Sequence, residues 1–436
     1  MDPVIEGAKP VAARAARQPL DGRSLIARKR FQFAGAMVIG AILPYLIRTL
    51  TVPGATLDPP NVNAMLGNGA AIILAFWMRL SITTYPGIRS SYVILPTALA
   101  AHGVIILFFL LSRLPYDRLA LTGGFLLHVL WIYFAWFIGE RRVRQKIAIV
   151  PFGSAGQLTA IAGVDWLVMK RPRLADASRC NAIVADFAAD LPDEWEAFLA
   201  DSALAGRIVY QVKQLSESLT GRVELEHLSE NSFGSLLPAR GWFHLKGLAD
   251  FIAAVAILPL ALPLMAAVAI AIKLEDGGDV LFRQKRIGHA GKRITVYKFR
   301  TMKPVEIADE RRAAMTSDGD ERVTRVGRFL RRSRIDELPQ IFNILKWQMS
   351  WIGPRPEAEV LSVWYTSELP FYRYRHVVKP GISGWAQVNQ GHVAEVDAVN
   401  EKLQYDFYYI KYFSPWLDLL ILFRTIKTVL TGFGAR

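Results

Sequence analysis

The run "FIAAVAILPLALPLMAAVAIAI", residues 251–272, is uncharged and as long as a helix that crosses a bilayer, which needs about 20 residues. Pro259 and Pro263 lie near its middle, and each removes a backbone donor and favours a kink. Since Lys and Arg stay on the cytoplasmic side of a membrane, we expect a helix over about 248–273 that enters the bilayer, breaks near Pro263 and returns to the same face. The cations that flank it are Lys246 on one side, and Lys273, Arg283, Lys285, Arg286, Lys292 and Arg293 on the other.

Four more apolar runs precede this segment, and each approaches the length of a membrane-spanning helix. They cover residues 32–50, 64–82, 92–112 and 119–139. Residues 1–30 are rich in Ala and Arg and contain no apolar core like that of a signal peptide, so they predict a disordered basic cytosolic tail. The sequence therefore predicts a four-helix transmembrane bundle over residues 31–140. Buried helices of a soluble domain are the alternative.

Lysine and arginine predict the orientation of this bundle. The basic tail precedes the first run, "ERRVRQK" (140–146) follows the fourth, and the first loop, residues 51–63, has neither Lys nor Arg. Arg113 and Arg118, in the third loop, run against this pattern. By the positive-inside rule, both ends of the bundle lie in the cytosol.

Residues 141–240 read as a soluble α/β domain. Strands are predicted in "KIAIVPFGSAG" (146–156), "NAIVADF" (181–187) and "RIVYQV" (207–212), with a helix in "PDEWEAFLADSALAG" (192–206). This alternation is typical of a Rossmann-like unit. The glycine turn has only Gly153 and Gly156, not the G-x-G-x-x-G fingerprint, so a structural or regulatory role is favoured over dinucleotide binding.

The overall composition narrows the possible partners. The 436 residues carry a formal net charge of +14, which suits nucleic acid, anionic lipid or phosphorylated substrates. Nucleic acid is disfavoured because the basic region is tied to membrane segments. Cys180 is the single cysteine, so an internal disulfide is excluded, and no spacing typical of a structural zinc site occurs.

Cations gather in four strings between residues 281 and 392. An interpretation without catalysis is a solvated basic face beside anionic lipid. However, cations on stiff turns next to the acids Asp336 and Glu337 indicate phosphate groups and a divalent metal. The strings are "LFRQKRIGHAGKRITVYKFRTM" (281–302), "GRFLRRSRIDELPQ" (327–340), "WIGPRP" (351–356) and "VVKPGISGWAQVNQGH" (377–392).

An adjacent acid pair suits phosphoryl transfer because the two carboxylates can act differently. Arg, Lys and Mg²⁺ stabilise the charge of a phosphoryl group in transfer. Mg²⁺ prefers carboxylate and phosphate oxygens, and a carboxylate can attack phosphorus to form an acyl-phosphate. Consecutive side chains on an α-helix point about 100° apart, so Asp336 and Glu337 would reach one phosphate as nucleophile and metal ligand. A solvated helix surface is the alternative.

Three motifs, "YKFRTM", "DELPQIFNILKWQMSWIGPRP" and "KPGISGWAQVN", follow a proline-containing apolar helix in this order. In this respect the chain resembles the bacterial polyprenyl-phosphate hexose-1-phosphate transferases, which are phosphoglycosyl transferases of the monotopic superfamily. The resemblance covers roughly residues 243–436. The four-span region and the Rossmann-like part also resemble the large architecture of this family, found in undecaprenyl-phosphate glucose and galactose phosphotransferases.

The resemblance implies an α-rich α+β catalytic domain over residues 241–436, facing the cytosol from the bacterial inner membrane. The implied reaction transfers a hexose-1-phosphate from a UDP-hexose to undecaprenyl phosphate in membrane lipid and releases UMP. It requires Mg²⁺, passes through a phosphosugar intermediate on the Asp of the pair, and starts exopolysaccharide, capsule or O-antigen assembly. No nucleic acid is implied, and a homodimer is an arrangement left to test.

Carried over by position, Asp336 is the expected nucleophile and Glu337 the expected Mg²⁺ ligand, with Asp336 sharing the metal site. Asp418 matches an acid near the family's site, although a charge at a helix N-terminus explains it equally well. The expected substrate-phosphate-binding residues are Lys298, Arg300, Arg331, Arg355, Lys379, Gln387, Asn389 and His392.

The sequence departs from the family pattern at three places. One is Gly278-Asp279, where the family often has Gly-Pro. Leu262 precedes Pro263 where the family usually has serine, and "VNQGH" replaces a string that ends in arginine, which leaves His392 as a candidate substitute and the sugar open. The C-terminal "WLDLLILFRTIKTVLTGF" (416–433) is either an interfacial anchor or a packed amphipathic helix.

A scaffold or regulator without catalysis and a transporter are the other functions considered. The intact Asp336–Glu337 pair argues against a scaffold. Few polar residues fall in the apolar runs, His102 and His128 among them, and this argues against a transporter.

Overall fold

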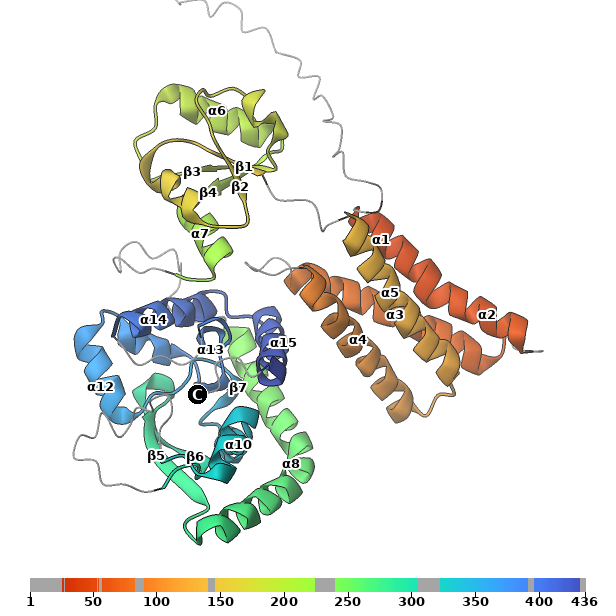
Figure 1. The fold of residues 1–436 in the computed structure, drawn as a ribbon. Coiled ribbons are helices and arrows are strands. Elements are labelled where there is room, and N and C mark those ends of the chain that lie inside the picture. The colour runs from red at the N-terminus through yellow and green to blue at the C-terminus, as the bar shows by residue number, and fades with distance from the viewer. Residues whose placement is uncertain are drawn as a thin grey trace, which may run out of the picture. The chain divides into compact units, whose positions relative to one another are not determined.

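The computed structural model describes residues 26, 28–52, 54, 57–82, 90–139, 146–223, 240–303, 322–390 and 396–431. The described residues up to Leu219 belong to one compact unit, and those from Thr220 onward belong to a second (Figure 1). Most of the predicted N-terminal tail and His392 lie outside the described residues.

The predicted apolar runs of the first unit are helical. The first run forms α1 (Lys29–Ala36), a π-helical segment η2 (Met37–Ile42) and α2 (Leu43–Thr51). The others form α3 (Pro59–Ile82), α4 (Ser90–Ser112) and α5 (Arg118–Gly139). Together with α8 of the second unit, they are five helices long and apolar enough to cross a membrane. The structure thus has the apolar helices of a membrane-embedded protein.

Small residues let these helices approach closely, as is common between helices in membranes. A Cβ at Gly124 of α5 would lie 2.0 Å from Asn68 Nδ2 of α3 and 2.5 Å from the carbonyl oxygen of Gly40. Large apolar side chains point outward instead, including Leu110 and Leu111 of α4. Close contacts at small residues together with exposed leucines are the arrangement expected of helices in lipid.

The soluble part of the first unit is an α/β domain with a parallel sheet of order β2-β1-β3-β4. Side chains of β1 alternate between its two faces: Ala148 packs with Trp195 of α6, and Ile149 packs with Leu215 of α7. The elements are β1 (Lys146–Ile149), η3 (Gly153–Ala160), β2 (Asp165–Val168), η4 (Asp176–Arg179), β3 (Ala182–Ala185), α6 (Asp193–Leu204), β4 (Ile208–Gln211) and α7 (Val212–Thr220).

Three of these strands and α6 lie where the sequence predicts them, and the parallel α/β arrangement is confirmed. Strand β2 was not predicted from the sequence. This strand is at the edge of the sheet, and its residues Leu167 and Val168 remain exposed. It therefore lacks the buried apolar run that marks β1 and β3.

The glycine turn after β1 is occupied by a side chain of the same domain. Gly153 adopts a left-handed φ of 59°, and a Cβ there would meet Asp186 Oδ2 at 2.4 Å. That oxygen accepts hydrogen bonds from Ser154 N and Ser154 Oγ at 2.9 and 2.7 Å. In dinucleotide-binding folds, amides of this turn hold a phosphate. Here the carboxylate of Asp186, rather than a phosphate, accepts the hydrogen bonds from this turn.

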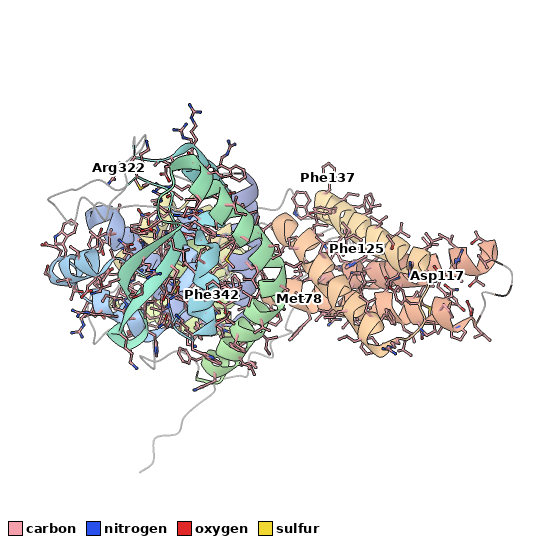
Figure 2. The ribbon with its side chains drawn as sticks, turned by 90° about the horizontal axis from the view of Figure 1, so that it is seen from below. Met78, Asp117, Phe125, Phe137, Arg322 and Phe342 are labelled. Carbon is pink, nitrogen blue, oxygen red and sulfur yellow. The ribbon has the colours of Figure 1, made fainter. Side chains whose placement is uncertain are left out.

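Helix α8 (Arg240–Asp276) begins the second unit as its longest helix among the described residues. The helix remains continuous through Pro259 and Pro263, so the predicted break is a bend rather than an interruption. Each proline leaves the carbonyl four residues earlier without its helical donor. The helix changes direction in both views (Figures 1 and 2).

The rest of the second unit is mostly helical, with two small sheets. An antiparallel hairpin pairs β5 (Leu281–Ile287) with β6 (Arg293–Phe299), and a parallel pair joins β7 (Ser350–Ile352) to β8 (Gly381–Ser383). The helical elements are η6 (His289–Gly291), α10 (Arg325–Ser333), η7 (Ile335–Gln340), α11 (Ile341–Leu345), α12 (Glu359–Glu368), η8 (Tyr372–Val377), α13 (Trp385–Asn389), α14 (Val396–Lys411) and α15 (Pro415–Thr431).

The core of this unit is built on one side of α8. Met265 and Ile272 of α8 pack in one buried cluster with Val296 of β6, Leu330 of α10 and Ile344 of α11. Other α8 side chains stay exposed, such as Leu260 at 79% and Leu274 at 81%. The same helix therefore supports the hairpin and the segment that carries the acid pair, while its outer side remains apolar and uncovered.

Replacing Gly381 by Ala is expected to lower the stability of the second unit. A Cβ at Gly381 would lie 2.1 Å from Gly353 N and 2.6 Å from the carbonyl carbon of Ile352, and these backbone atoms cannot rotate aside. We expect the free energy of unfolding to fall by about 1–3 kcal/mol, seen as a lower Tm in detergent. In Gly241→Ala, where a Cβ meets nothing within 4 Å, Tm should stay unchanged or rise slightly. Equal Tm values for the two variants would contradict this close packing.

Candidate active site

The acid pair lies directly after a sharp change in the backbone. Thr324 caps α10 by accepting a hydrogen bond from Gly327 N at 2.9 Å, and the helix ends at Arg334, whose φ is +59°. This left-handed conformation costs a non-glycine residue about 1 kcal/mol or more. Asp336 and Glu337 then follow in the 3₁₀ helix η7. Because a 3₁₀ helix has three residues per turn, their side chains point about 120° apart and meet different neighbours.

Glu337 is buried and held by two cations. Lys298 Nζ and Arg355 Nη1 both donate to Glu337 Oε1, at 2.8 and 2.9 Å, while Arg334 Nη1 lies 4.0 Å from Oε2. Burial by itself would raise the pKa of Glu337, but Lys298 and Arg355 outweigh burial and hold this pKa well below its usual range. Glu337 is therefore ionised at any physiological pH.

Asp336 has the opposite environment. It is 8% exposed, and its Oδ1 has no hydrogen-bond partner among the described residues. Burial and the neighbouring charge of Glu337 raise the pKa of Asp336, and Lys298 and Arg355 oppose this rise only in part. The two adjacent acids thus differ in environment: the pKa of Glu337 is lowered and its carboxylate is paired, whereas the pKa of Asp336 is raised and its Oδ1 is buried without a hydrogen-bond partner among the described residues.

The two cations on Glu337 come from separate parts of the chain. Lys298 is near the end of β6, where it pairs with Phe282 of β5, and Arg355 lies in the turn after β7. Burial lowers the pKa of Lys298 to about 8, although Glu337 opposes this change. Arg286 of β5 is a third cation here: burial, and then Arg355, lower its pKa to about 10. From the sequence, Arg286 is only one of the charges that flank the apolar run, because nothing in a strand pattern indicates what its side chain contacts.

Four of the other predicted phosphate-binding residues contact groups elsewhere in the unit. Arg300 forms an ion pair with Asp276 at the end of α8. The Lys379 ammonium lies 4.5 Å from the ring centroid of Trp347. Gln387 Nε2 donates to Ile382 O at 3.0 Å, and Asn389 Nδ2 donates to Trp385 O at 2.7 Å. Arg331 is partly buried in the last turn of α10, beside the acid pair in sequence.

Asp418, the weaker candidate, does stand in the first turn of a helix, α15, but its carboxylate joins several elements. It accepts hydrogen bonds from Tyr409 Oη at 2.7 Å and from Trp242 Nε1 at 3.2 Å, and Lys246 Nζ lies 3.2 Å away. Lys246 is also 3.6 Å from Asp250. These contacts tie α15 and α14 to the start of α8.

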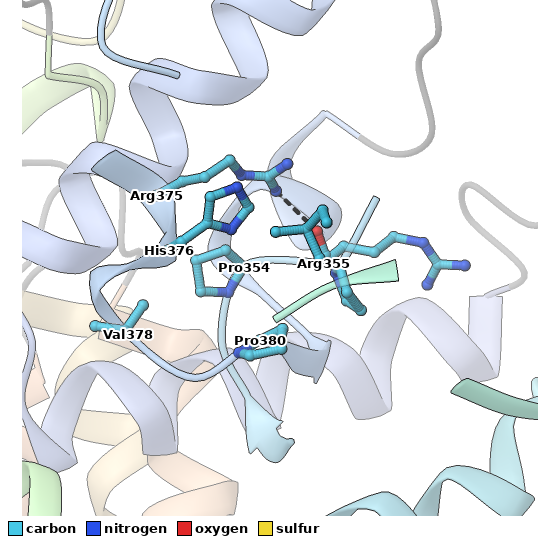
Figure 3. A pocket seen from close by; sticks show the side chains of 8 residues that line it. Pro354, Arg355, Arg375, His376, Val378 and Pro380 are labelled. Atoms are coloured by element: carbon cyan, nitrogen blue, oxygen red, sulfur yellow. Dashed lines mark hydrogen bonds between the residues drawn. The ribbon is translucent and has the colours of Figure 1, made fainter. Parts of the chain in front are cut away.

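A small pocket lies beside the turn that carries Arg355. Figure 3 shows the Arg355 side chain directed away from Pro354, His376 and Val378, while Arg375 reaches the backbone of the turn. The pocket is lined by Ile287, Pro354, Arg355, Pro356, Arg375, His376, Val378 and Pro380. The turn is therefore contacted on one side by the pocket residues, while its guanidinium extends to Glu337.

This arrangement defines a class of protein. A buried carboxyl group with an unpaired oxygen, next to an ionised carboxylate held by Lys and Arg, is suited to bind and transfer a phosphoryl group. Among its described residues, the same chain has five helices that are long and apolar enough to cross a membrane. The fold and the site together are those of a membrane-attached phosphoryl transferase.

Comparison with known proteins identifies the family. A family model described as bacterial sugar transferase matches residues 242–432. The chain is 45% identical, over 93% of its length and 95% of the relative, to a UDP-N-acetylgalactosamine-undecaprenyl-phosphate N-acetylgalactosaminephosphotransferase of Aeromonas hydrophila. UDP-glucose:undecaprenyl-phosphate glucose-1-phosphate transferases of Escherichia coli and Caulobacter vibrioides are each 42% identical. They align over 42% and 43% of this chain and over 39% and 70% of their own lengths.

The chain belongs to the bacterial polyprenyl-phosphate hexose-1-phosphate transferases, as the motifs of its last 190 or so residues suggest. It is a sugar-phosphate transferase enzyme. The long Aeromonas alignment extends the relationship beyond the catalytic part to most of the N-terminal helices and the α/β domain.

The pH dependence of the transferase activity should depend on Lys298. Since the pKa of Lys298 is about 8, the free enzyme loses this cation as pH rises through that value, and kcat/KM should fall. In Lys298→Arg the cation stays protonated, so the alkaline limb should move to higher pH. The acid limb should lie above the usual range of an aspartate, because the pKa of Asp336 is raised. An alkaline limb that is unchanged in Lys298→Arg would contradict the assignment.

Proposed function

We propose that this enzyme transfers a hexose-1-phosphate from a UDP-sugar to undecaprenyl phosphate, which yields undecaprenyl-diphosphate-hexose and UMP. The reaction would start assembly of an exopolysaccharide, capsule or O-antigen. The observation that carries the proposal is that Asp336 Oδ1, buried and without a hydrogen-bond partner among the described residues, lies beside Glu337, which Lys298 and Arg355 keep ionised. The Aeromonas relative is named for UDP-N-acetylgalactosamine, so that sugar is the first to test, followed by UDP-glucose.

In the first proposed step, Asp336 Oδ1 attacks the phosphorus that carries the sugar. A bond forms between that oxygen and phosphorus, the phosphoanhydride bond to the nucleotide breaks, and UMP leaves with the electron pair. In the second step, a phosphate oxygen of undecaprenyl phosphate attacks the same phosphorus and releases the Asp336 carboxylate. Dividing one transfer into two displacements is the usual advantage of a protein nucleophile. Each step needs one chain only, so a homodimer is not required.

Lys298 and Arg355 are proposed to have two roles, one toward Glu337 and one toward the substrate phosphates. They hold Glu337 in place, and their remaining N–H groups would donate to phosphoryl oxygens as negative charge moves onto the departing phosphate. Arg300, Arg331, Lys379, Gln387, Asn389 and His392 stay proposed contacts of the substrate phosphates. When a nucleotide sugar binds, Arg300, Gln387 and Asn389 would have to break their present contacts or share their N–H groups with the phosphate oxygens.

A magnesium ion fits the acid pair. Asp336 Oδ1 has no hydrogen-bond partner among the described residues, and Glu337 Oε2 has a cation only at 4.0 Å, so each acid retains an oxygen suited to Mg²⁺. When bound, the ion would neutralise negative charge on the substrate phosphates. We propose that Glu337 is its main protein ligand and that Asp336 contributes while unreacted.

The proposed location is the cytosolic face of the bacterial inner membrane. Cations on both sides of α8 favour a helix that bends at Pro259 and Pro263 and returns to the face it entered. Nucleotide sugars are cytosolic, and the phosphate of the lipid acceptor lies in the headgroup layer. A re-entrant α8 would hold the acid pair at that layer, with its exposed Leu260 and Leu274 in lipid.

Asp336→Asn is expected to abolish transfer. In membranes supplied with undecaprenyl phosphate, Mg²⁺ and the UDP-sugar, UMP release should fall on the order of 10³-fold or more, because the amide is no nucleophile. Without acceptor, the wild type should release about one UMP per enzyme and the variant none. Asp279→Asn, an exposed acid in the same unit, is the matched control and should keep full activity. Activity that persists in Asp336→Asn would exclude Asp336 as the nucleophile.

Cysteine labelling tests the path of α8. In a Cys180→Ser background, His244→Cys and Asp279→Cys place one exposed thiol near the start of α8 and one just after its end. If α8 returns to the same face, a membrane-impermeant maleimide should label both thiols in inverted vesicles and neither in intact cells. Labelling of the two positions from opposite sides would mean that α8 crosses the membrane.

A further inference from the structure

The turn that carries Arg355 has little backbone support of its own. Pro354 and Pro356 flank Arg355, and neither has an N–H to donate. The structure anchors the front of the turn through Gly381 N, which donates to Pro354 O at 3.0 Å. The next two carbonyls, those of Arg355 and Pro356, receive side-chain donors instead.

Arg286 of β5 holds the second of these carbonyls. Its Nη1 donates to Pro356 O, while Nε and Nη2 both donate to Gln284 Oε1, at 3.0 and 2.7 Å. The adjacent backbone continues the contact, since Ile287 N donates to Glu357 O at 3.2 Å. The fork of Arg286 thus joins the hairpin to the turn. Its hydrogen-bond acceptors are an amide oxygen and a carbonyl, so no carboxylate occupies this guanidinium through a hydrogen bond in the described structure.

Arg375 of η8 holds the first carbonyl. Its Nη2 donates to Arg355 O at 2.8 Å, as Figure 3 shows, and the same nitrogen lies 2.8 Å from Asp406 Oδ2. Its Nη1 donates to Tyr372 Oη at 2.8 Å. Arg375 is 3% exposed and Asp406 is 1% exposed, so water screens the interaction between them very little.

The residue after the turn belongs to the same buried network. Glu357 forms an ion pair with Lys402 of α14, and Arg375 Nη1 lies 3.9 Å from its Oε1. Lys402 and Asp406 stand one helical turn apart on α14. Helix α14 therefore supplies charged partners both to Glu357 and to the arginine that holds Arg355.

We propose that Arg286 and Arg375 are positioning residues: together they grip the carbonyls of Pro356 and Arg355 from behind and so fix the Arg355 guanidinium on Glu337. Neither needs to touch the substrate to act. This inference rests on the proposed function for its kinetic test, but the structural part of that test needs no turnover. A misplacement of about 1 Å in a group that positions charge can cost roughly 100-fold in rate, which makes the effect measurable.

Arg286 offers the primary test, because removing Arg375 would leave Asp406 buried without its partner and endanger folding. Arg286→Met and Arg355→Ala are made singly and together, and kcat/KM for sugar-phosphate transfer is measured for all four proteins. If Arg286 acts through Arg355, Arg286→Met should lower kcat/KM by roughly 10- to 100-fold alone and by less than about twofold in the Arg355→Ala background. An equal fold-loss in both backgrounds, or no loss in the wild-type background, would overturn the proposal and, in the first case, indicate a separate role in binding phosphate.

Arg293→Met is the matched control. It removes a cation from the same hairpin, where the side chain is 75% exposed and pairs with Glu359. Its kcat/KM should stay within about twofold of the wild type. A loss as large as that of Arg286→Met would show that general charge on the hairpin matters rather than the grip on the turn.

Hydrogen exchange separates this inference from the proposed function. In Arg286→Met, the amides of Ile287 and Gly381, which donate to carbonyls of the turn, should exchange faster than in the wild type, while those of α6 in the first unit should not change. Unaltered exchange of these two amides would refute positioning even if activity falls. Conversely, a wild type without transfer activity would refute the proposed function, and the exchange comparison would still decide whether Arg286 holds the turn.

Discussion

The pairing of Glu337 with Lys298 and Arg355 is the interaction on which the site depends. These three charges come from the 3₁₀ helix η7, the hairpin strand β6 and the turn after β7, so they meet only when all three elements are in place. Burial alone would raise the pKa of Glu337, but the two cations outweigh burial and hold this pKa low. Burying charges is costly unless they are paired, so the site and the packing around it stabilise or fail together.

The same pairing makes two adjacent acids unequal. The negative charge retained on Glu337 joins burial in raising the pKa of Asp336, while the cations that could lower it are already turned toward Glu337. A change from an α-helix to a 3₁₀ helix contributes to this division by directing the two side chains further apart. The pairing also affects Lys298. Burial lowers the pKa of Lys298 to about 8, and Glu337 opposes this change, so the charge of Lys298 near neutral pH depends on the neighbouring carboxylate.

Helix α8 gives this charged site its setting. One side of the helix forms the core beneath β6, α10 and α11, and the other exposes leucines that a soluble protein would cover. The prolines bend the helix without ending it, because the turns on either side keep their hydrogen bonds. Support of the acid pair and an exposed apolar surface are therefore properties of one element.

The sequence by itself determined the features that depend on local pattern. Apolar runs marked the long helices, buried strand runs marked β1 and β3, and the ordered motifs with Asp336–Glu337 indicated the family and the chemistry. Only the tertiary structure decided which cations meet the acids. Lys298 and Arg355 contact Glu337, whereas Arg300 pairs with Asp276 and Lys379 lies over Trp347. It also revealed the arginines behind the Arg355 turn and the edge strand β2. The physical reason is that the sequence shows which residues are cations but not where their long side chains point. That direction depends on the nearest acceptor, which for these cations comes from another part of the chain.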